Sequence, residues 1–201
     1  MKKYSIWLIF AFAICLLVNS FYMVAKAHLA QVLLDHTWQN VLKQNLLKQE
    51  NKKLSPLLPW AWADFHPVAK LTFLRFGLSH IVLNTDSGQA LAFGPGLTGA
   101  NASNIDGMTI ISGHNDSHFK MLEALKMGDK VLLEDNQAKR QYYRIDNTLI
   151  IDTRLSQLHI EDSAQGLVLV TCYPFGGVIS TTPYRFVVQA TPIDSLALVS
   201  L

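Results

Sequence analysis

The sequence is poor in cysteine and in net charge, and both shortages narrow what the protein can be. Its 201 residues include two cysteines and carry a formal net charge of +2. No cluster of Lys and Arg alternates with aromatic residues, so nucleic acid is not an expected partner. The chain also lacks low-complexity tracts and repeats at the periods of solenoids. The length suits one domain with a real hydrophobic core, plus additional segments.

One uncharged stretch stands out at the start of the chain. Two lysines precede an apolar span from Tyr4 to Ala25, close to the ~20 residues that cross the hydrocarbon core of a membrane. No matching basic cluster follows, which predicts a cytoplasmic N-terminus and an exported body. We assign residues 1–25 to a cytoplasmic start and a transmembrane signal anchor. A cleaved signal peptide is the alternative, because Ala25 and Ala27 offer small residues at a cleavage site.

Behind this span, the pattern predicts a helix followed by a linker. From Lys26 to Lys53 apolar residues recur every three or four positions without Gly or Pro, as in an amphipathic helix. This helix is either a stalk or an ordinary helix without a specific role. Pro56 to Pro67 is rich in Trp and Pro. We expect its rings to pack on the domain surface, with anchoring at a membrane interface as the alternative. Residues 26–66 are thus assigned to a helical stalk and linker.

From Val68 onward the sequence is typical of β-structure. Short runs of Val, Ile, Leu, Phe and Tyr are separated by Gly, Asn and Asp, as in a sandwich or barrel. One short helix is expected at Phe119–Lys126. The predicted strands are Val68–Phe76, Ser79–Asn84, Met108–Ser112, Lys130–Glu134, Gln141–Ile151, Leu167–Thr171 and Arg185–Ala190. We expect a mainly β protein with a compact β-barrel over residues 67–193 and a tail over 194–201.

Cys172 is the first candidate for a catalytic residue. It ends an apolar run and precedes Tyr173-Pro174, and because proline cannot continue the ladder, the thiol is expected where the sheet opens. The other cysteine, Cys15, lies in the predicted membrane span, so the two are not expected to pair. An unpaired thiol in an exported protein indicates reactivity or intermolecular pairing. Taken alone, Cys172 is as well explained as a small buried hydrophobe at a strand end.

His114 and Arg185 supply the other two groups that acyl transfer through a thioester requires. His114 follows a strand that ends in Gly113, so it begins a loop, where it can favour the thiolate and protonate a departing amine. Arg185 opens the last predicted strand. Facing inward, it needs an anionic or carbonyl partner, such as a scissile carbonyl and its oxyanion. Taken alone, each is better explained as a solvated surface side chain.

Three other chemistries fit the residues less well. The segment His114–His118 holds two histidines and a carboxylate, but no further His/Cys pair follows at the spacing of zinc ligands. The acidic residues Glu134-Asp135, Asp152 and Glu161-Asp162 lack the looped pattern of a calcium site. No Gly-x-Ser-x-Gly elbow supports a serine hydrolase. We therefore expect neither a metal nor a cofactor.

The order of histidine, cysteine and arginine resembles that of a sortase. Gly113-His114 and Thr171-Cys172 each end a strand, Arg185 lies on the last strand, and the chain continues after His114 as sortases do. Three segments further resemble the Gram-negative branch, the class GN or marine proteobacterial sortases; they are Pro59–Asp64, Leu91–Gly96 and Thr171–Phe175. The similarity covers Pro59 to about Ile193.

The resemblance implies an eight-stranded sortase β-barrel with short helices and the activity of a cysteine transpeptidase. Cys172 would attack a backbone carbonyl in a C-terminal sorting motif of the LPxTG type and form a thioester. His114 would protonate the leaving amine, and Arg185 would hold the carbonyl and stabilise the oxyanion. Thr171 would line the substrate pocket. An incoming amine would then resolve the thioester.

The resemblance also implies a partner and a location. The expected partner is a secreted protein with a C-terminal sorting signal, of the kind that carries VIT and von Willebrand A-type domains. The enzyme is expected in the inner membrane as a single-pass protein with its catalytic domain in the periplasm. A Gram-negative envelope has no exposed thick wall, so the accepting amine is open, and a cysteine peptidase that uses water is one alternative. A non-catalytic assembly module on the same barrel is another, against which the intact trio argues.

Overall fold

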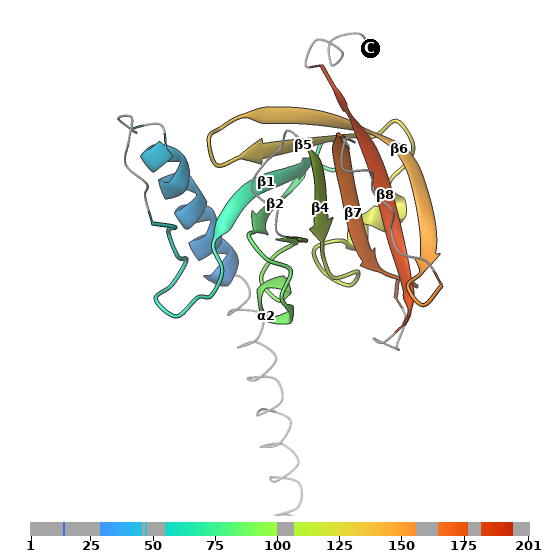
Figure 1. Cartoon of the computed structure of the whole chain (residues 1–201). Coiled ribbons are helices and arrows are strands. Elements are labelled where there is room, and N and C mark those ends of the chain that lie inside the picture. The colour runs from blue at the N-terminus through green and yellow to red at the C-terminus, as the bar shows by residue number, and fades with distance from the viewer. Residues whose placement is uncertain are drawn as a thin grey trace, which may run out of the picture.

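Eight strands form a closed β-barrel at the centre of the computed structural model (Figure 1). The structure describes residues 14, 29–45, 47, 55–99, 107–155, 165–176 and 182–194. The strands are β1 (Pro67–Phe73), β2 (Leu78–Leu83), β3 (Gly96–Leu97), β4 (Met108–Ser112), β5 (Lys130–Asp135), β6 (Arg140–Asp152), β7 (Gly166–Cys172) and β8 (Tyr184–Ile193). They close in the order β1-β2-β3-β4-β7-β8-β6-β5. The expected eight-stranded barrel is confirmed.

The barrel interior is filled by alternate residues of its strands, as the two-residue period of a strand requires. On β1, Ala69, Leu71 and Phe73 are buried while the residues between them are partly exposed. Leu167 and Leu169 of β7 point into the same core. This alternation fixes which residues of each strand face outward, and the candidate site lies on an outward face.

Two differences from the predicted strands have local causes. β1 ends at Phe73 rather than Phe76, because the chain turns before β2 and Gly77 takes a φ of 62°, which favours glycine. β3 was not predicted, since two residues are too few for an alternating pattern. Gly96 of β3 is a close approach: a Cβ there would lie 2.0 Å from the carbonyl oxygen of Thr85, so only glycine fits.

The short helices also differ from expectation. The helix predicted at Phe119–Lys126 is a 3-10 helix, η1, over Lys120–Ala124. A four-residue helix, α2 (Gly88–Leu91), was not predicted; the Ser87 side chain caps it by accepting a hydrogen bond from the Ala90 N–H. Four residues are too few to show helical periodicity, which is why α2 was missed.

The N-terminal helix packs on the outside of the barrel. Residues 29–45 are helical and lie beside β1 and β2 (Figure 1). Leu34 and Trp38 are buried in a second core whose other members come from β2, α2 and the linker; they are Phe65, Ile81, Leu83 and Ala90. The Asn45 side chain also donates to the Asn136 carbonyl at 2.5 Å. The helix therefore contributes to the folded domain.

The predicted membrane span over Tyr4–Ala25 lies outside the described residues, except for Ile14. Within the part of the chain that the structure describes, no helix has both the length and the apolarity to cross a membrane. The predicted helix from Lys26 to Lys53 is described over residues 29–45, and Leu47 lies in a turn. Of the predicted tail, only Asp194 is described.

The packing of the N-terminal helix predicts a contrast between two leucines. Leu34 has no exposed surface and Leu29 is 59% exposed. Leu34→Ala should lower the free energy of unfolding by about 2–5 kcal/mol, because it leaves a cavity between helix and barrel. Leu29→Ala, the matched control, should change it by about 0.5 kcal/mol or less. Denaturant unfolding of both variants measures this, and equal effects would contradict the packing.

Candidate active site

Two parallel strands bring His114 and Cys172 to the same end of the barrel. β4 and β7 run side by side in register, with Ser112 opposite Val170. The Gly113 N–H donates to the Val170 carbonyl at 3.1 Å, so the pairing continues past the end of β4. His114 follows directly, and Cys172 ends β7. The register therefore sets His114 beside the strand end that carries the thiol.

Cys172 and Arg185 lie directly opposite each other on the antiparallel pair β7–β8. Leu169 and Val188 of the same strands pack in the barrel core, so alternation turns Cys172 and Arg185 to the outer face. Opposed residues in such a pair hold their Cβ atoms ~4.5–5.5 Å apart. Cys172 is a half-buried free thiol. Thiol and guanidinium therefore share one face of the sheet.

The Arg185 guanidinium holds the backbone where β8 begins. Its Nη1 donates to the carbonyls of Thr182 at 2.7 Å and of Tyr184 at 2.9 Å. The Tyr184 carbonyl also accepts from the Tyr173 N–H at 3.1 Å, and the Thr182 hydroxyl donates to the Tyr173 carbonyl. The expected carbonyl partner of Arg185 is thus its own chain in this structure. Among the described residues these bonds engage one nitrogen, Nη1, of a group with five N–H donors.

Thr171 lies beneath the site. It is 2% exposed, and its hydroxyl donates to the Gly113 carbonyl at 2.6 Å. This bond joins β7 to the residue that precedes His114. The expectation that Thr171 lines the substrate pocket stays a prediction; its observed contact is with the backbone that positions the histidine.

The loop after His114 is fixed at both ends. The Phe119 N–H donates to the His114 carbonyl at 2.9 Å, and the Asn115 side chain donates to the Pro174 carbonyl at 2.9 Å. The Phe119 ring is fully buried in the barrel core. A Cβ on Gly113 would lie 2.7 Å from that ring, so the ring leaves room only for glycine. His114 itself is exposed above this support.

A histidine of this loop, His118, packs on a second histidine, His80. The His118 ring meets the His80 ring of β2 edge-on, with centroids 5.5 Å apart, and the His80 ring lies 6.4 Å from that of Phe73. His80 Nε2 is buried without a hydrogen-bond partner in the described residues. Sequence reasoning missed this pair because the two residues lie on different elements, and no spacing rule connects them.

Burial keeps both of these imidazoles neutral at pH 7. It lowers the pKa of His80 to about 4, with the nearby His118 as the smaller cause. Burial also lowers the pKa of His118, and the charge of His114 adds to this while Asp116 opposes it. His118 packs on His80, and among the described residues no three His, Cys, Asp or Glu side chains converge as metal ligands would.

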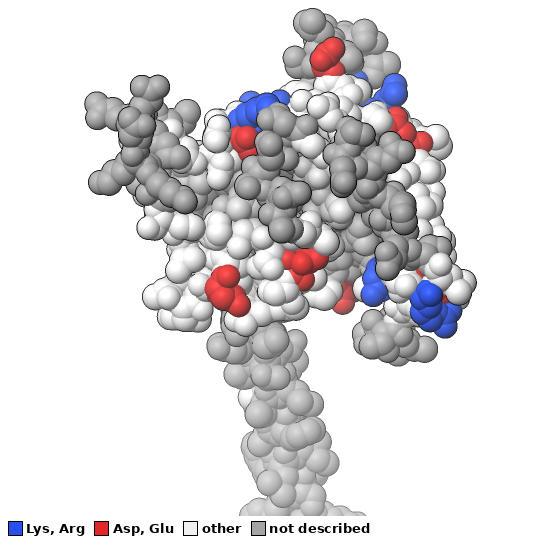
Figure 2. Space-filling model, in the orientation of Figure 1, with Lys and Arg blue, Asp and Glu red and all other residues white. Residues whose placement is uncertain are grey.

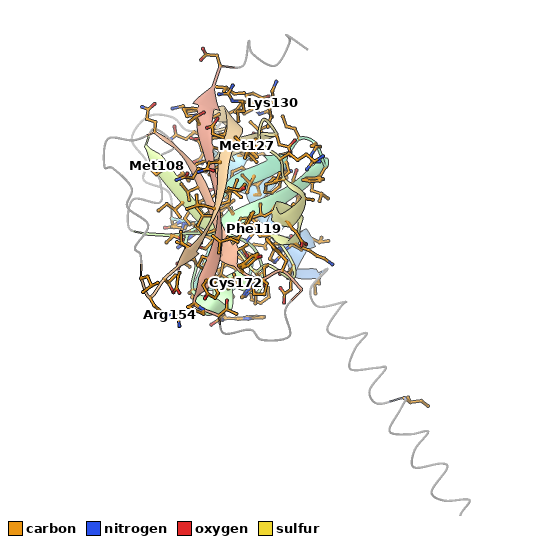
Figure 3. The ribbon with its side chains drawn as sticks, turned by 90° about the vertical axis from the view of Figure 1, so that its right-hand side faces the viewer. Met108, Phe119, Met127, Lys130, Arg154 and Cys172 are labelled. Atoms are coloured by element: carbon orange, nitrogen blue, oxygen red, sulfur yellow. The ribbon has the colours of Figure 1, made fainter. Side chains whose placement is uncertain are left out.

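Valines share the face of the thiol, and an ion pair lies at the same end of the barrel. Val168, Val170 and Val187 share the outward face of β7 and β8 with Cys172, and Val168 and Val187 are buried there. Figure 3 shows Arg154 at the same end of the barrel as Cys172. Its Nη2 lies 2.6 Å from Asp152 Oδ2. Figure 2 shows basic side chains gathered at the lower right of the face drawn there.

Comparisons with known proteins identify relatives of this fold. The family model that matches is described as a sortase domain and covers residues 71–193. A curated relative, sortase D of Bacillus subtilis (strain 168), is 25% identical over 83 residues. That match spans 41% of this chain and 41% of the relative, less than half of its length.

Solved structures resemble the whole domain. Sortase A from Corynebacterium diphtheriae is 18% identical with a TM-score of 0.55, and the match covers 86% of this chain and 93% of that chain. Sortase A from Listeria monocytogenes is 18% identical with a TM-score of 0.56, covering 64% and 88%. Sortase C from Clostridium perfringens SM101 is 21% identical with a TM-score of 0.53, covering 81% and 90%. At these sequence identities the structural likeness shows a shared fold and nothing further.

The close contact under Gly113 predicts the effect of adding one methyl group. Gly113→Ala should lower the free energy of unfolding by about 1–3 kcal/mol, because the Phe119 ring must move. Gly107→Ala is the control, since nothing lies within 4 Å of a Cβ there. The loss at Gly113 should shrink in a Phe119→Leu background, which urea unfolding of the double variant measures. An equal loss in both backgrounds would refute the steric explanation.

The buried His80 predicts a pH-dependent stability. The folded protein protonates His80 only near pH 4, whereas an unfolded chain does so near 6.5, so the unfolded state binds the extra proton between these values. The contribution of His80 is complete above pH 6.5 and is lost as the pH falls toward 4, by up to about 3 kcal/mol. His80→Phe should make the free energy of unfolding depend less steeply on pH between these two values. The exposed His36→Phe control should keep the slope, and an unchanged slope in His80→Phe would contradict the assignment.

Proposed function

The chain belongs to the sortase family, and from this premise we propose that it is a membrane-anchored cysteine transpeptidase. It cleaves a C-terminal sorting motif of the LPxTG type and transfers the acyl group to an amine. The observation that carries the proposal is the cross-strand pair of Cys172 and Arg185, with His114 at the neighbouring strand end. A nucleophile, an acid and an oxyanion donor are the groups that this reaction needs.

The geometry supports a two-step reaction. The Cys172 thiolate attacks the scissile carbonyl carbon, and N–H donors of the Arg185 guanidinium stabilise the resulting oxyanion. The C–N bond then breaks, and His114 gives its proton to the departing nitrogen, which leaves a thioester on Cys172. An incoming amine attacks the thioester carbonyl, loses a proton to His114 and releases the thiolate. Val170, the partly exposed valine on the same face as Cys172, supports an apolar part of the motif beside the thiol.

Sequence features extend the proposal to place and partner. The uncharged span Tyr4–Ala25 after two lysines supports a single-pass anchor in the inner membrane, with the barrel in the periplasm. Resemblance to the class GN branch supports a secreted substrate with a C-terminal sorting signal, of the kind that carries VIT and von Willebrand A-type domains. Water competes with an amine for the thioester.

Cleavage of a sorting-motif peptide by the purified full chain tests the proposal. Cys172→Ala should abolish cleavage, because the other thiol, Cys15, lies in the predicted membrane span and cannot replace it. His114→Ala should lower kcat/KM by about 10²–10⁴ through loss of the acid, and Arg185→Ala by about 10²–10³ through loss of oxyanion donors. Cys15→Ala and His36→Ala, the matched controls, should retain activity.

The products decide between transfer and hydrolysis in the same assay. With an added amine, part of the acyl product should appear as the amide rather than the free acid. Free acid alone at every amine concentration would identify a peptidase that uses water. Undiminished cleavage by Cys172→Ala would refute the proposal.

A further inference from the structure

The linker between the N-terminal helix and β1 carries two tryptophans with opposite surroundings. Trp60 packs edge-on against Phe65 and Phe93, with ring centroids 5.4 and 5.0 Å apart. Trp62, two residues later, is 80% exposed. The expectation that the linker aromatics pack on the domain holds for Trp60. It is wrong for Trp62.

The exposure of Trp62 is built into a turn that is held on both sides. The Ala63 N–H donates to the Trp60 carbonyl at 3.1 Å, and Ala63 and Phe65 are buried. Trp60 packs against the second core and Ala63 is buried, so the turn between them projects from the surface. Trp62 is thus presented outward by packed neighbours.

The segment that leads into this turn is uncharged. From Leu54 to Ala63 the sequence carries no charge, and Leu58 is also exposed. Figure 2 shows mostly uncharged side chains on the left of this face, with acidic side chains along its lower edge. The exposed Asp64 follows this segment. An exposed apolar segment without Lys or Arg does not depend on anionic headgroups, and Trp is enriched at the membrane interface because its ring is amphipathic.

Chain connectivity places a membrane on this side of the domain. The uncharged span Tyr4–Ala25 ends just before Leu29, where the described part of the N-terminal helix begins. In Figure 1 the start of this helix, the lowest turn of the linker and the ends of β4 and β7 lie at the same end of the molecule. Leu29 and Val32 on this first turn are exposed as well.

We propose that Trp62 and Leu58 insert into the interface of the bilayer and hold the Cys172 end of the barrel against the membrane surface. The contact rests on the membrane anchor of the proposed function and adds a second point of attachment. A single anchor leaves the domain free to tilt relative to the membrane, whereas a second point of attachment fixes its orientation on the membrane surface. A substrate held in the same membrane is thereby presented to Cys172 in preference to a soluble peptide.

Spin labelling of the full chain in liposomes of phosphatidylcholine and phosphatidylglycerol tests the contact. The label goes on Ala61→Cys, beside an intact Trp62, in a Cys15→Ala, Cys172→Ala background. Met127→Cys is the reference, since Met127 is 73% exposed and lies toward the opposite end of the barrel from Cys172 (Figure 3). The label at position 61 should be reached better by oxygen than by a water-soluble nickel chelate. The label at 127 should show the reverse.

A second substitution shows whether Trp62 makes the contact. Adding Trp62→Ser to the Ala61→Cys variant should return the label to a water-like accessibility. Equal nickel accessibility at positions 61 and 127 before that change would overturn the proposal. Protection at 61 only after a substrate protein is added would assign the turn to a protein partner, and would overturn it too.

Failure of the anchor itself is distinguishable from failure of this contact. If alkaline carbonate removes the chain from the liposomes, the proposed anchor is wrong; if the chain stays but the label at 61 faces water, only the contact is wrong.

The contact also predicts a difference in activity between two substrates. Trp62→Ser should slow cleavage of a membrane-embedded substrate several-fold and leave cleavage of a soluble peptide unchanged. Equal rates of the variant and the native chain on both substrates would contradict the role in presentation.

Discussion

The parallel pairing of β4 with β7 is the constraint on which the site depends. It places Gly113-His114 and Thr171-Cys172 at one end of the barrel although they lie far apart in the chain. Two backbone-directed bonds extend the pairing past the last ladder residue, from the Gly113 N–H to Val170 and from the Thr171 hydroxyl to Gly113. Because β8 pairs with β7 on its other side, the same register also sets Arg185 opposite the thiol.

The surrounding structure holds this arrangement from within and from one side. Phe119 fills the space under Gly113, and the neutral pair His80–His118 supports the loop without bringing positive charge into the core. The N-terminal helix and linker close the outer face of β2 and leave one tryptophan exposed. The site end of the barrel thus has a rigid interior and an apolar projection beside it.

Local pattern predicted the strands that carry the chemistry, and it failed where structure depends on distant contacts. β4, β7 and β8 contain runs of β-branched residues, so the strands and the order of His114, Cys172 and Arg185 were visible in the sequence, although β8 ends at Ile193 rather than Ala190. β3 and α2 are too short for any period. The opposite surroundings of Trp60 and Trp62 depend on Phe93, and the His80–His118 contact joins two elements, so neither follows from spacing. Arg185 binding to the carbonyls of Thr182 and Tyr184 depends on the geometry of the β7–β8 connection.

The central claim is that Cys172 carries the acyl group, and mass spectrometry of the intact chain tests it most directly. The native chain is mixed with a sorting-motif peptide, with no acceptor amine added. The reaction is quenched in acid during turnover, and the mass of the intact chain is measured. The account predicts an added mass equal to the acyl fragment, located on Cys172 by digestion and removed by hydroxylamine. Product formation with the acyl group on another residue, or with Cys172 unmodified throughout turnover, would contradict it.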